Sequence, residues 1–269
     1  MSNTAKGGVK ARNVIFRIKR CEGPGKPSRW EAFKVPVEPN ANVISCLNWI
    51  AANPVTIDGK QTTPVVWDSN CLEEVCGACT MLINGRVRQS CSCLIDAYAP
   101  NEGDTITLEP MSKFPVVRDL WVDRQRLFWG LKKVKAWVPI DGTYSLGEGP
   151  RETPEHQHDR YIMSTCMSCA CCLEACPQYH KEDDQNKWDR SYVGAAVVNQ
   201  ARLFNEHGTG QVLKPERLDA LMGPGGLDAC GKSENCVKVC PKHIPLVESI
   251  AAVNRALTIH GFKRVFSGQ

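Results

Sequence analysis

The chain has 269 residues, which is enough for two domains of ordinary size, and it carries 15 cysteines and a formal net charge of +4. Thiolate-bound metal clusters would change that charge. Three oxidised clusters with their thiolates carry about −2 each, which would bring the loaded protein to about −2. Net charge therefore gives no support for binding to nucleic acid.

The cysteines do not indicate the disulfides of a small secreted domain. The chain is long, its cysteine count is odd, and no apolar leader segment follows Met1. No stretch reaches the roughly 18 apolar residues of a transmembrane helix. We therefore expect a soluble protein of a reducing compartment, with no transmembrane segment in this chain.

The first part of the chain predicts a small sheet crossed by one helix. Apolar and charged residues alternate through the first strand candidate, and Asn84-Gly85 is a strong signal for a type I′ hairpin turn. The helix candidate has its apolar residues at helical spacing. The expected strands are 14–20, 30–37, 80–83, 86–88 and 105–108, and the expected helix is 43–52.

The character of the chain changes after Pro110. Residues 117–137 are charged and helical in period, whereas residues 141–158 read as an exposed connection in which His156 and His158 are exposed polar residues. We place the boundary near residues 115–125, which gives an N-terminal domain of residues 1–120 and a helical domain of residues 121–269. Further helices are expected at 193–206, 215–222 and 246–259.

The first cysteine group has the spacing of a plant-type two-iron cluster. The pattern Cys71-x4-Cys76-x2-Cys79 is specific, and a fourth ligand follows the predicted hairpin as either Cys91 or Cys93. Gly77 lies between two ligands, where a small residue lets backbone amides approach the sulfides closely. A structural zinc site is the alternative, but zinc sites usually pair two CxxC motifs, and the x4 spacing breaks that pattern.

Two further runs follow the bacterial pattern C-x2-C-x2-C-x3-C-P, in which the fourth cysteine ligates the partner cluster. The first run is complete, whereas the second has Ser233 in place of its second cysteine. Cys171 breaks the regular step of the first run and is not expected to be a ligand. The exchange rule predicts a four-iron cluster on Cys166, Cys169, Cys172 and Cys240.

Ser233 leaves the other cluster with three cysteines, Cys176, Cys230 and Cys236. A serine hydroxyl is a poor iron ligand at neutral pH because its proton has a very high pKa. We therefore expect a three-iron cluster that lacks this corner. Cluster type helps to set reduction potentials over roughly −700 to +450 mV, and the higher potentials of three-iron clusters suit the quinone-facing end of an electron-transfer chain. The alternative is a degenerate run that binds no metal.

With these cysteine groups in this order, the chain resembles the iron–sulfur subunits of succinate dehydrogenase and the related quinol:fumarate reductases. The resemblance covers most of the chain and implies an α+β fold, with a plant-type ferredoxin β-grasp domain followed by an all-α bacterial-ferredoxin-like domain. It also favours Cys91 over Cys93 as a ligand. The matching segments are Cys71-Leu-Glu-Glu-Val-Cys76-Gly-Ala-Cys79, Asn84-Gly85, Cys91, Asp119-Leu120, 131–137, Cys166-x2-Cys169-Ala-Cys171-Cys172, Cys176-Pro177 and Cys236-x3-Cys240-Pro241-Lys242.

The resemblance also implies a function. Electrons would pass one at a time from FAD on a flavoprotein subunit through [2Fe-2S], [4Fe-4S] and [3Fe-4S] clusters to a membrane quinone. The chain would do no substrate chemistry itself. Its partners would be that flavoprotein and a membrane anchor, often with haem b, which would hold the chain on the cytoplasmic face of the cell membrane.

The chain departs from the ubiquinone-linked members of this family. Those members place Trp residues shortly after the position of Cys176 and a His after the position of Cys230, where this chain has Gln178 and Gly231. The chain is closer to menaquinone-linked bacterial members. Candidates for a quinone pocket are Pro177, His180 and Lys181, although contact with solvent or another subunit is the plainer interpretation of each.

Three alternative functions have distinct signatures. Fumarate reductase is the same series of clusters run in the opposite direction. A stand-alone ferredoxin would have no fixed partners, and the helices beyond those needed for cluster binding argue against it. A zinc-bound scaffold protein would hold no iron. Two smaller features are expected to be structural: Cys21 and Cys46 as buried hydrophobic side chains, and Lys132, Lys133 and Lys135 as a solvated helix face.

Overall fold

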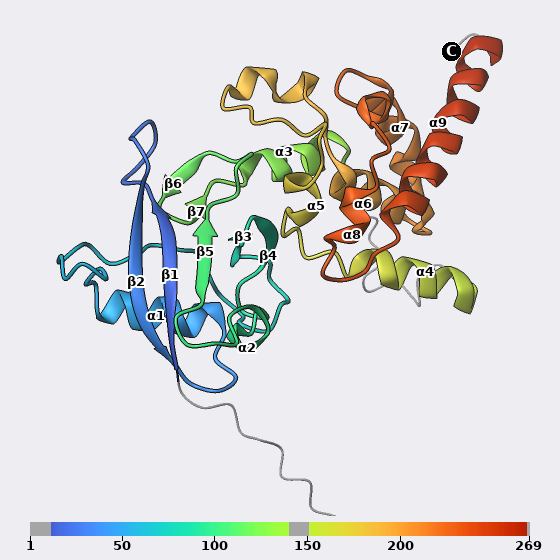
Figure 1. Ribbon diagram of the computed structural model, residues 1–269. Helices are drawn as coiled ribbons and strands as arrows, with labels where there is room; N and C mark the ends of the chain where they lie inside the picture. The colour runs from blue at the N-terminus through green and yellow to red at the C-terminus, as the bar shows by residue number, and fades with distance from the viewer. Residues whose placement is uncertain (1–11, 140–150, 268–269) are drawn as a thin grey trace, which may run out of the picture. The chain divides into compact units, whose positions relative to one another are not determined.

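The computed structural model describes residues 12–139 and 151–267, and the chain divides into two compact units, the first ending at Asp123 and the second beginning at Arg124. The first unit contains a five-stranded sheet in the order β2-β1-β5-β3-β4 (Figure 1). The strands are β1 (Arg12–Arg20), β2 (Arg29–Val37), β3 (Thr80–Ile83), β4 (Arg86–Gln89) and β5 (Thr105–Glu109). β1 pairs antiparallel with β2 and parallel with β5, and β3 pairs antiparallel with both β4 and β5.

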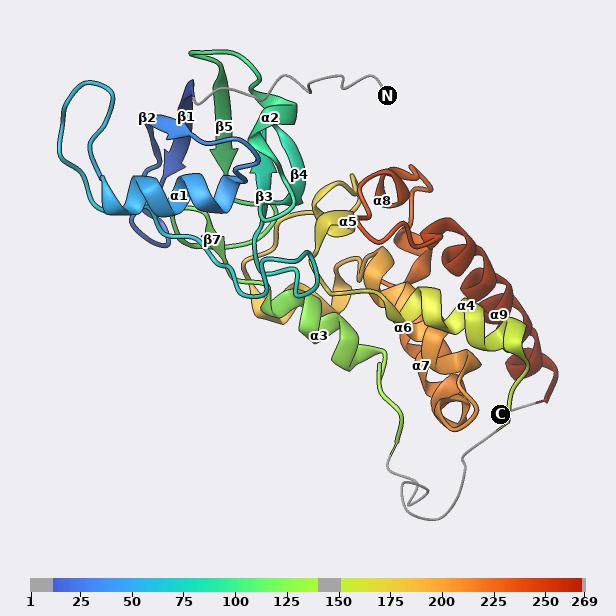
Figure 2. The same cartoon turned by 90° about the horizontal axis from the view of Figure 1, so that it is seen from below.

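One helix, α1 (Val43–Ala52), covers a face of this sheet (Figures 1 and 2). Its apolar side chains, among them Leu47 and Ile50, are buried in the same core as Phe16 and Ile18 of β1. Asn42 caps the helix, because its side chain accepts a hydrogen bond from the amide of Ser45 at 2.9 Å. The expected sheet crossed by one helix is therefore confirmed. The remaining short elements of this unit are α2 (Ile95–Tyr98), β6 (Val116–Arg118) and β7 (Trp121–Val122).

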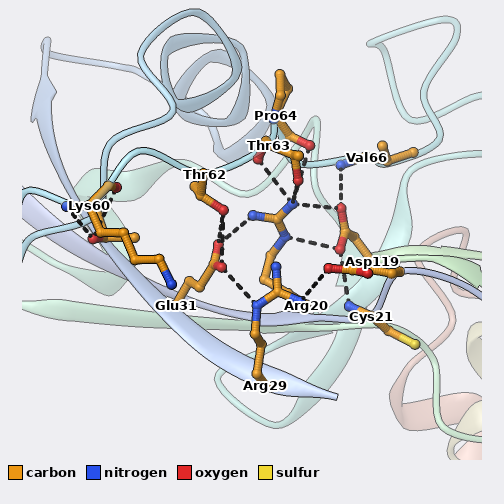
Figure 3. A network of polar contacts seen from close by, with 12 residues as sticks. Arg20, Cys21, Arg29, Glu31, Lys60, Thr62, Thr63, Pro64, Val66 and Asp119 are labelled. Carbon is orange, nitrogen blue, oxygen red and sulfur yellow. Dashed lines mark hydrogen bonds and ion pairs between the residues drawn. The ribbon is translucent and has the colours of Figure 1, made fainter. Parts of the chain in front are cut away.

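The helix expected over residues 117–137 is wrong for its first part. β6 and β7 form a small antiparallel pair there, and the backbone turns at Asp119, whose φ is +47°. The Asp119 carboxylate accepts hydrogen bonds from the buried Arg20 guanidinium at 2.9 Å and from the amides of Cys21 and Val66 at 3.0 Å each (Figure 3). These partners are distant in sequence, so they impose a turn that the local charge pattern does not indicate.

The second unit is helical. Its α-helices are α3 (Gln125–Lys133), α4 (Pro154–Ser164), α5 (Cys171–Glu174), α6 (Ala195–Glu206), α7 (Lys214–Met222), α8 (Asn235–Lys238) and α9 (Leu246–Ser267). The 3-10 segments in the described part of this unit are η2 (Gln185–Arg190), η3 (Gly210–Leu213) and η4 (Leu227–Ala229). The helices expected near residues 193, 215 and 246 are confirmed, and the last extends beyond its expected end at residue 259. Within the described residues, no helix is both long and apolar enough to span a membrane.

The helix α6 is the centre of this unit, and α3, α4, α7 and α9 pack against it. Its Asn199 is fully buried and joins two neighbours: the amide donates to the Met163 carbonyl at 3.1 Å, and the amide oxygen accepts from the Ser249 hydroxyl at 3.0 Å. On the α3 side, a side chain at Gly130 would lie 2.9 Å from a methyl of Val197, so glycine permits the close approach of these helices.

Two expectations about polar residues need correction. His156 and His158 are exposed as expected, but they lie on α4 and not in a connection, because Thr153 and Pro154 start a helix there; residues 140–150 lie outside the described part of the chain. Lys133 does not belong to a solvated face, because its ammonium donates to the carbonyls of Asp189 at 2.5 Å and Pro224 at 2.8 Å. Such lysine contacts depend on segments that meet only in the folded chain.

Candidate iron–sulfur sites

The β3–β4 hairpin brings two cysteines of the first group together. Asn84 and Gly85 have φ of +50° and +72°, as the type I′ turn requires, and Thr80 lies opposite Gln89 in the ladder. The pairing continues past the strands, because the Ser90 amide donates to the Cys79 carbonyl at 3.2 Å. Cys79 and Cys91 therefore emerge at the same end of the hairpin.

The loop before β3 wraps its amides around thiol sulfurs. The Cys71 sulfur accepts from the amides of Glu73 at 3.4 Å and of Val75 and Cys76 at 3.3 Å each. These hydrogen bonds stabilise a thiolate and lower the pKa of Cys71 to about 7. Positive φ values at Leu72, Glu74 and Gly77 (+60°, +54° and +72°) produce this curled backbone.

The same loop reaches Cys91. The Glu74 amide donates to the Cys91 sulfur at 3.3 Å, and burial raises the pKa of Cys79 to about 12, with the neighbouring Cys91 thiol contributing to the rise. Cys93 has a different environment. Burial raises the pKa of Cys93 to about 11, and the group that opposes this rise is Arg88. The thiols that gather around the loop are thus Cys71, Cys76, Cys79 and Cys91, and Cys21 and Cys46 are buried elsewhere in the unit.

The two cysteine runs of the second unit share one backbone path. Ser168 and Ala170 in the first run have φ of +52° and +69°, and Lys232 and Glu234 in the second run have +54° and +58°. Each run then forms a four-residue helix, α5 or α8, directly after its second left-handed residue. The hydrogen bonds also match, since Cys176 donates to Leu173 at 3.2 Å where Cys240 donates to Val237 at 3.3 Å. Ser233 therefore occupies the place of Cys169.

The first set of thiols in this unit combines three cysteines of one run with one of the other. Cys166, Cys169, Cys172 and Cys240 line one cavity, together with Ile244 and Leu246. Burial raises the pKa of Cys172 well above its usual value, and charge from Cys169, Cys166 and Cys240 adds to this effect. Four sulfurs that influence one another in an apolar cavity form a suitable binding site for a four-iron cluster.

Cys171 lines the same cavity as these four cysteines. It is the first residue of α5 and is almost completely buried. A hydrogen bond from the Cys171 side chain is the main cause that lowers the pKa of Cys169. The extra cysteine is therefore a neighbour of a candidate ligand, and it lies close to the predicted four-iron site without being part of the regular spacing.

The second set of thiols in this unit combines one cysteine of the first run with two of the second run. Cys176, Cys230 and Cys236 line a cavity of about 300 Å³ whose wall also includes Ser233 and Tyr192. Burial raises the pKa of Cys236, and charge from Cys176 and Cys230 contributes to the rise. Three thiols and one hydroxyl on a cavity of this size fit a cluster that has three cysteine ligands.

The candidates for a quinone pocket are all exposed, and neither cysteine-lined cavity includes them. Lys181 forms an ion pair with Asp183 at 3.2 Å, and the His180 carbonyl accepts a hydrogen bond from Arg126. Gly231 lies against Gln178: a side chain added at position 231 would come within 2.3 Å of the Gln178 amide nitrogen. These two departures from the ubiquinone-linked pattern are therefore in contact with each other.

Sequence reasoning missed Tyr192 in the wall of the second cavity. It lies between two cysteine runs and belongs to no ligand spacing, so only the fold brings it to the site. Among the described residues, no three His, Cys, Asp or Glu side chains gather closely enough to hold a single metal ion.

Comparison with known proteins agrees with this arrangement. Residues 15–129 match the model of a 2Fe-2S iron–sulfur cluster binding domain, and residues 162–244 match that of a 4Fe-4S dicluster domain. The succinate dehydrogenase iron–sulfur subunit of Bacillus subtilis is 54% identical over 255 residues, covering 95% of this chain and 96% of that protein. The fumarate reductase iron–sulfur subunit of Wolinella succinogenes is 26% identical over 245 residues, covering 90% and 95%.

A similar fold is found in a solved structure, that of the Mycobacterium smegmatis Sdh1 complex in the apo form. The TM-score is 0.78 at 20% sequence identity, and the match covers 94% of this chain and 98% of that chain. At this identity the likeness concerns the fold alone.

Proposed function

Because the chain belongs to the succinate dehydrogenase iron–sulfur subunits and serves as the electron-transfer subunit of that enzyme, we propose that its cysteines hold three clusters of different type. The two-iron cluster is bound by Cys71, Cys76, Cys79 and Cys91. The four-iron cluster is bound by Cys166, Cys169, Cys172 and Cys240, and the three-iron cluster by Cys176, Cys230 and Cys236.

The exchange between the two runs is the observation that best supports this assignment. Cys240 lines the cavity of Cys166, Cys169 and Cys172, whereas Cys176 lines the cavity of the other run. Two clusters that share runs in this way lie close together, which suits rapid electron transfer between them. Ser233 at the corner of the second cavity supports a three-iron cluster there.

The clusters supply one-electron transfer between FAD of a flavoprotein subunit and a membrane quinone. The residues of the chain around each cluster would adjust its reduction potential. Amides around Cys71 stabilise a thiolate, and the wall of the four-iron cavity is largely apolar. The Cys171 thiol adds a hydrogen bond to a candidate ligand, Cys169.

The chain acts in a membrane complex in this proposal. Its partners are a flavoprotein with covalent FAD and a membrane anchor, of a kind that often carries haem b, and the anchor keeps the chain on the cytoplasmic face of the cell membrane. Menaquinone is the favoured quinone, because Gln178 and Gly231 depart from the ubiquinone-linked pattern and pack together. Pro177, His180 and Lys181 remain candidates for quinone contacts. We favour succinate oxidation over fumarate reduction, because the relative that is 54% identical is named a succinate dehydrogenase subunit.

Purification of the tagged chain from detergent-solubilised membranes tests this function. We expect the flavoprotein and the anchor to co-purify with the chain, and we expect added succinate to bleach the visible absorbance of the clusters. The same sample without succinate is the control. Recovery of the chain alone from the soluble fraction, with its clusters loaded and indifferent to succinate, would instead indicate a stand-alone carrier.

A further inference from the structure

A buried tyrosine lines the cavity of the proposed three-iron cluster. Tyr192 lines the cavity that contains Cys176, Cys230 and Cys236, and its side chain is 5% exposed. Burial is the main cause that raises the pKa of Tyr192, and both the charge of Cys230 and a side-chain hydrogen bond to it raise this pKa further. Tyr192 and Cys230 line the same cavity, and a thiolate can only accept, so a hydrogen bond between the two side chains runs from the Tyr192 hydroxyl to the Cys230 sulfur.

The backbone around this tyrosine is held from two sides. The amide of Val193 donates to the Gly225 carbonyl at 3.0 Å. On the other side, Gly194 has φ of +89°, and an added Cβ would lie 2.0 Å from a methyl carbon of Leu173 in α5. The backbone at Tyr192 is thus held between the Gly225 turn and α5, the short helix within the run of Cys166 to Cys176.

We propose that Tyr192 is a positioning residue that donates a hydrogen bond to the Cys230 thiolate and thereby raises the reduction potential of the cluster in this cavity. The inference rests on the three-iron cluster of the proposed function. Reduction adds one electron and no proton in this account, so the negative charge on the ligand sulfurs increases. A donor aimed at one of these sulfurs is stronger in the reduced state and stabilises it.

Burial of the site increases the effect of this hydrogen bond on the reduction potential. A hydrogen bond to a charged acceptor contributes more in a low-dielectric cavity than in water. Removal of the hydroxyl alone, with the ring kept in place, therefore lowers the potential without opening a cavity in the wall. Tyr192→Phe makes this change.

The test is a redox titration of the purified complex, followed by the EPR signal of the oxidised three-iron cluster. We expect Tyr192→Phe to shift the one-electron equilibrium about tenfold toward the oxidised state, which lowers the midpoint potential by about 59 mV. Tyr179→Phe is the matched control. Tyr179 is also buried, but its neighbours are Arg126 and Cys172 and it does not line this cavity, so the three-iron potential should stay unchanged.

A second variant keeps the test decisive if Tyr192→Phe does not load its cluster. Replacement of Tyr192 by a ring-fluorinated tyrosine strengthens the donor and should raise the midpoint potential, which is a shift of the opposite sign. A three-iron signal with the same potential in wild type and in the loaded variants would overturn the inference and leave the proposed function intact. Absence of a three-iron signal from the wild-type complex would overturn both.

Discussion

Ser233 and Cys169 occupy equivalent backbone positions in the two cysteine runs of the helical unit. Each is flanked by two residues of positive φ, and each is followed by a four-residue helix that begins two positions later. The backbone at Ser233 is therefore already shaped to present a fourth ligand. What the site lacks is a thiol at that position and not the loop geometry.

Ser233→Cys should therefore convert the three-iron site toward a four-iron cluster and lower its reduction potential, because a cysteine thiolate can ligate the missing corner. The measurement is EPR of the oxidised and the reduced protein, in which the oxidised three-iron signal should fall. Ser164→Cys adds a cysteine on the exposed side of α4 and should leave the spectrum as in wild type. An unchanged three-iron spectrum in Ser233→Cys would show that this alignment of the second run is incorrect.

Cys91 and Cys93 should respond differently to replacement by alanine. The Cys91 sulfur accepts a hydrogen bond from the ligand loop, so Cys91→Ala should abolish or strongly deplete the two-iron cluster. Cys93→Ala removes a buried thiol beside Arg88 and should keep the cluster, at a cost in stability of about 1 kcal/mol. The rhombic EPR signal of the dithionite-reduced protein distinguishes the two variants. Loss of this signal in Cys93→Ala alone would reverse the assignment.

Asp119→Ala should destabilise the first unit strongly, because it leaves the buried Arg20 cation without one of its two carboxylate partners. Breaking a buried ion pair costs about 3 to 5 kcal/mol. The change should appear as a lower urea concentration at which the two-iron absorbance disappears. Glu22→Gln breaks the exposed Arg29–Glu22 pair, which is 3.0 Å long, and should cost less than about 1 kcal/mol. Equal effects of the two substitutions would contradict the structural role of Asp119.

Arg217→Met should destabilise the helical unit. The Arg217 guanidinium is fully buried and donates to the carbonyls of Gly210 at 2.7 Å, Trp137 at 2.9 Å and Lys135 at 3.0 Å. Each carbonyl left without a donor costs about 1 to 3 kcal/mol, so the melting temperature followed by far-UV circular dichroism should fall by several degrees. Arg264→Met, at an exposed position on α9, serves as the control and should change it little.

The features that the sequence predicts well are those with a local cause. The Asn84-Gly85 turn can adopt positive φ at both residues, which determines the hairpin and hence the place of Cys91. The cysteine spacings likewise predict the type of cluster from short segments of the sequence. The family resemblance then indicates the order of the two domains, and the fold agrees with it.

The features that the sequence does not predict depend on partners far along the chain. Residues near 119 have a helical charge pattern, but Arg20 lies 99 positions away and holds Asp119 in a turn. The charge pattern predicts a solvated Lys133, but in the folded chain its ammonium donates to the carbonyls of Asp189 and Pro224. Tyr192 has no motif of its own, and its position in the cavity wall follows from the packing of α5 and α6 around Gly194.

The central claim is that the chain carries three clusters of different type, and low-temperature EPR tests it most directly. The purified complex would be measured after air oxidation and again after reduction with dithionite. We predict a near-isotropic three-iron signal in the oxidised sample that disappears on reduction, together with the appearance of a rhombic two-iron signal. An EPR-silent oxidised sample would contradict the claim, because the second cavity would then hold either a four-iron cluster or none.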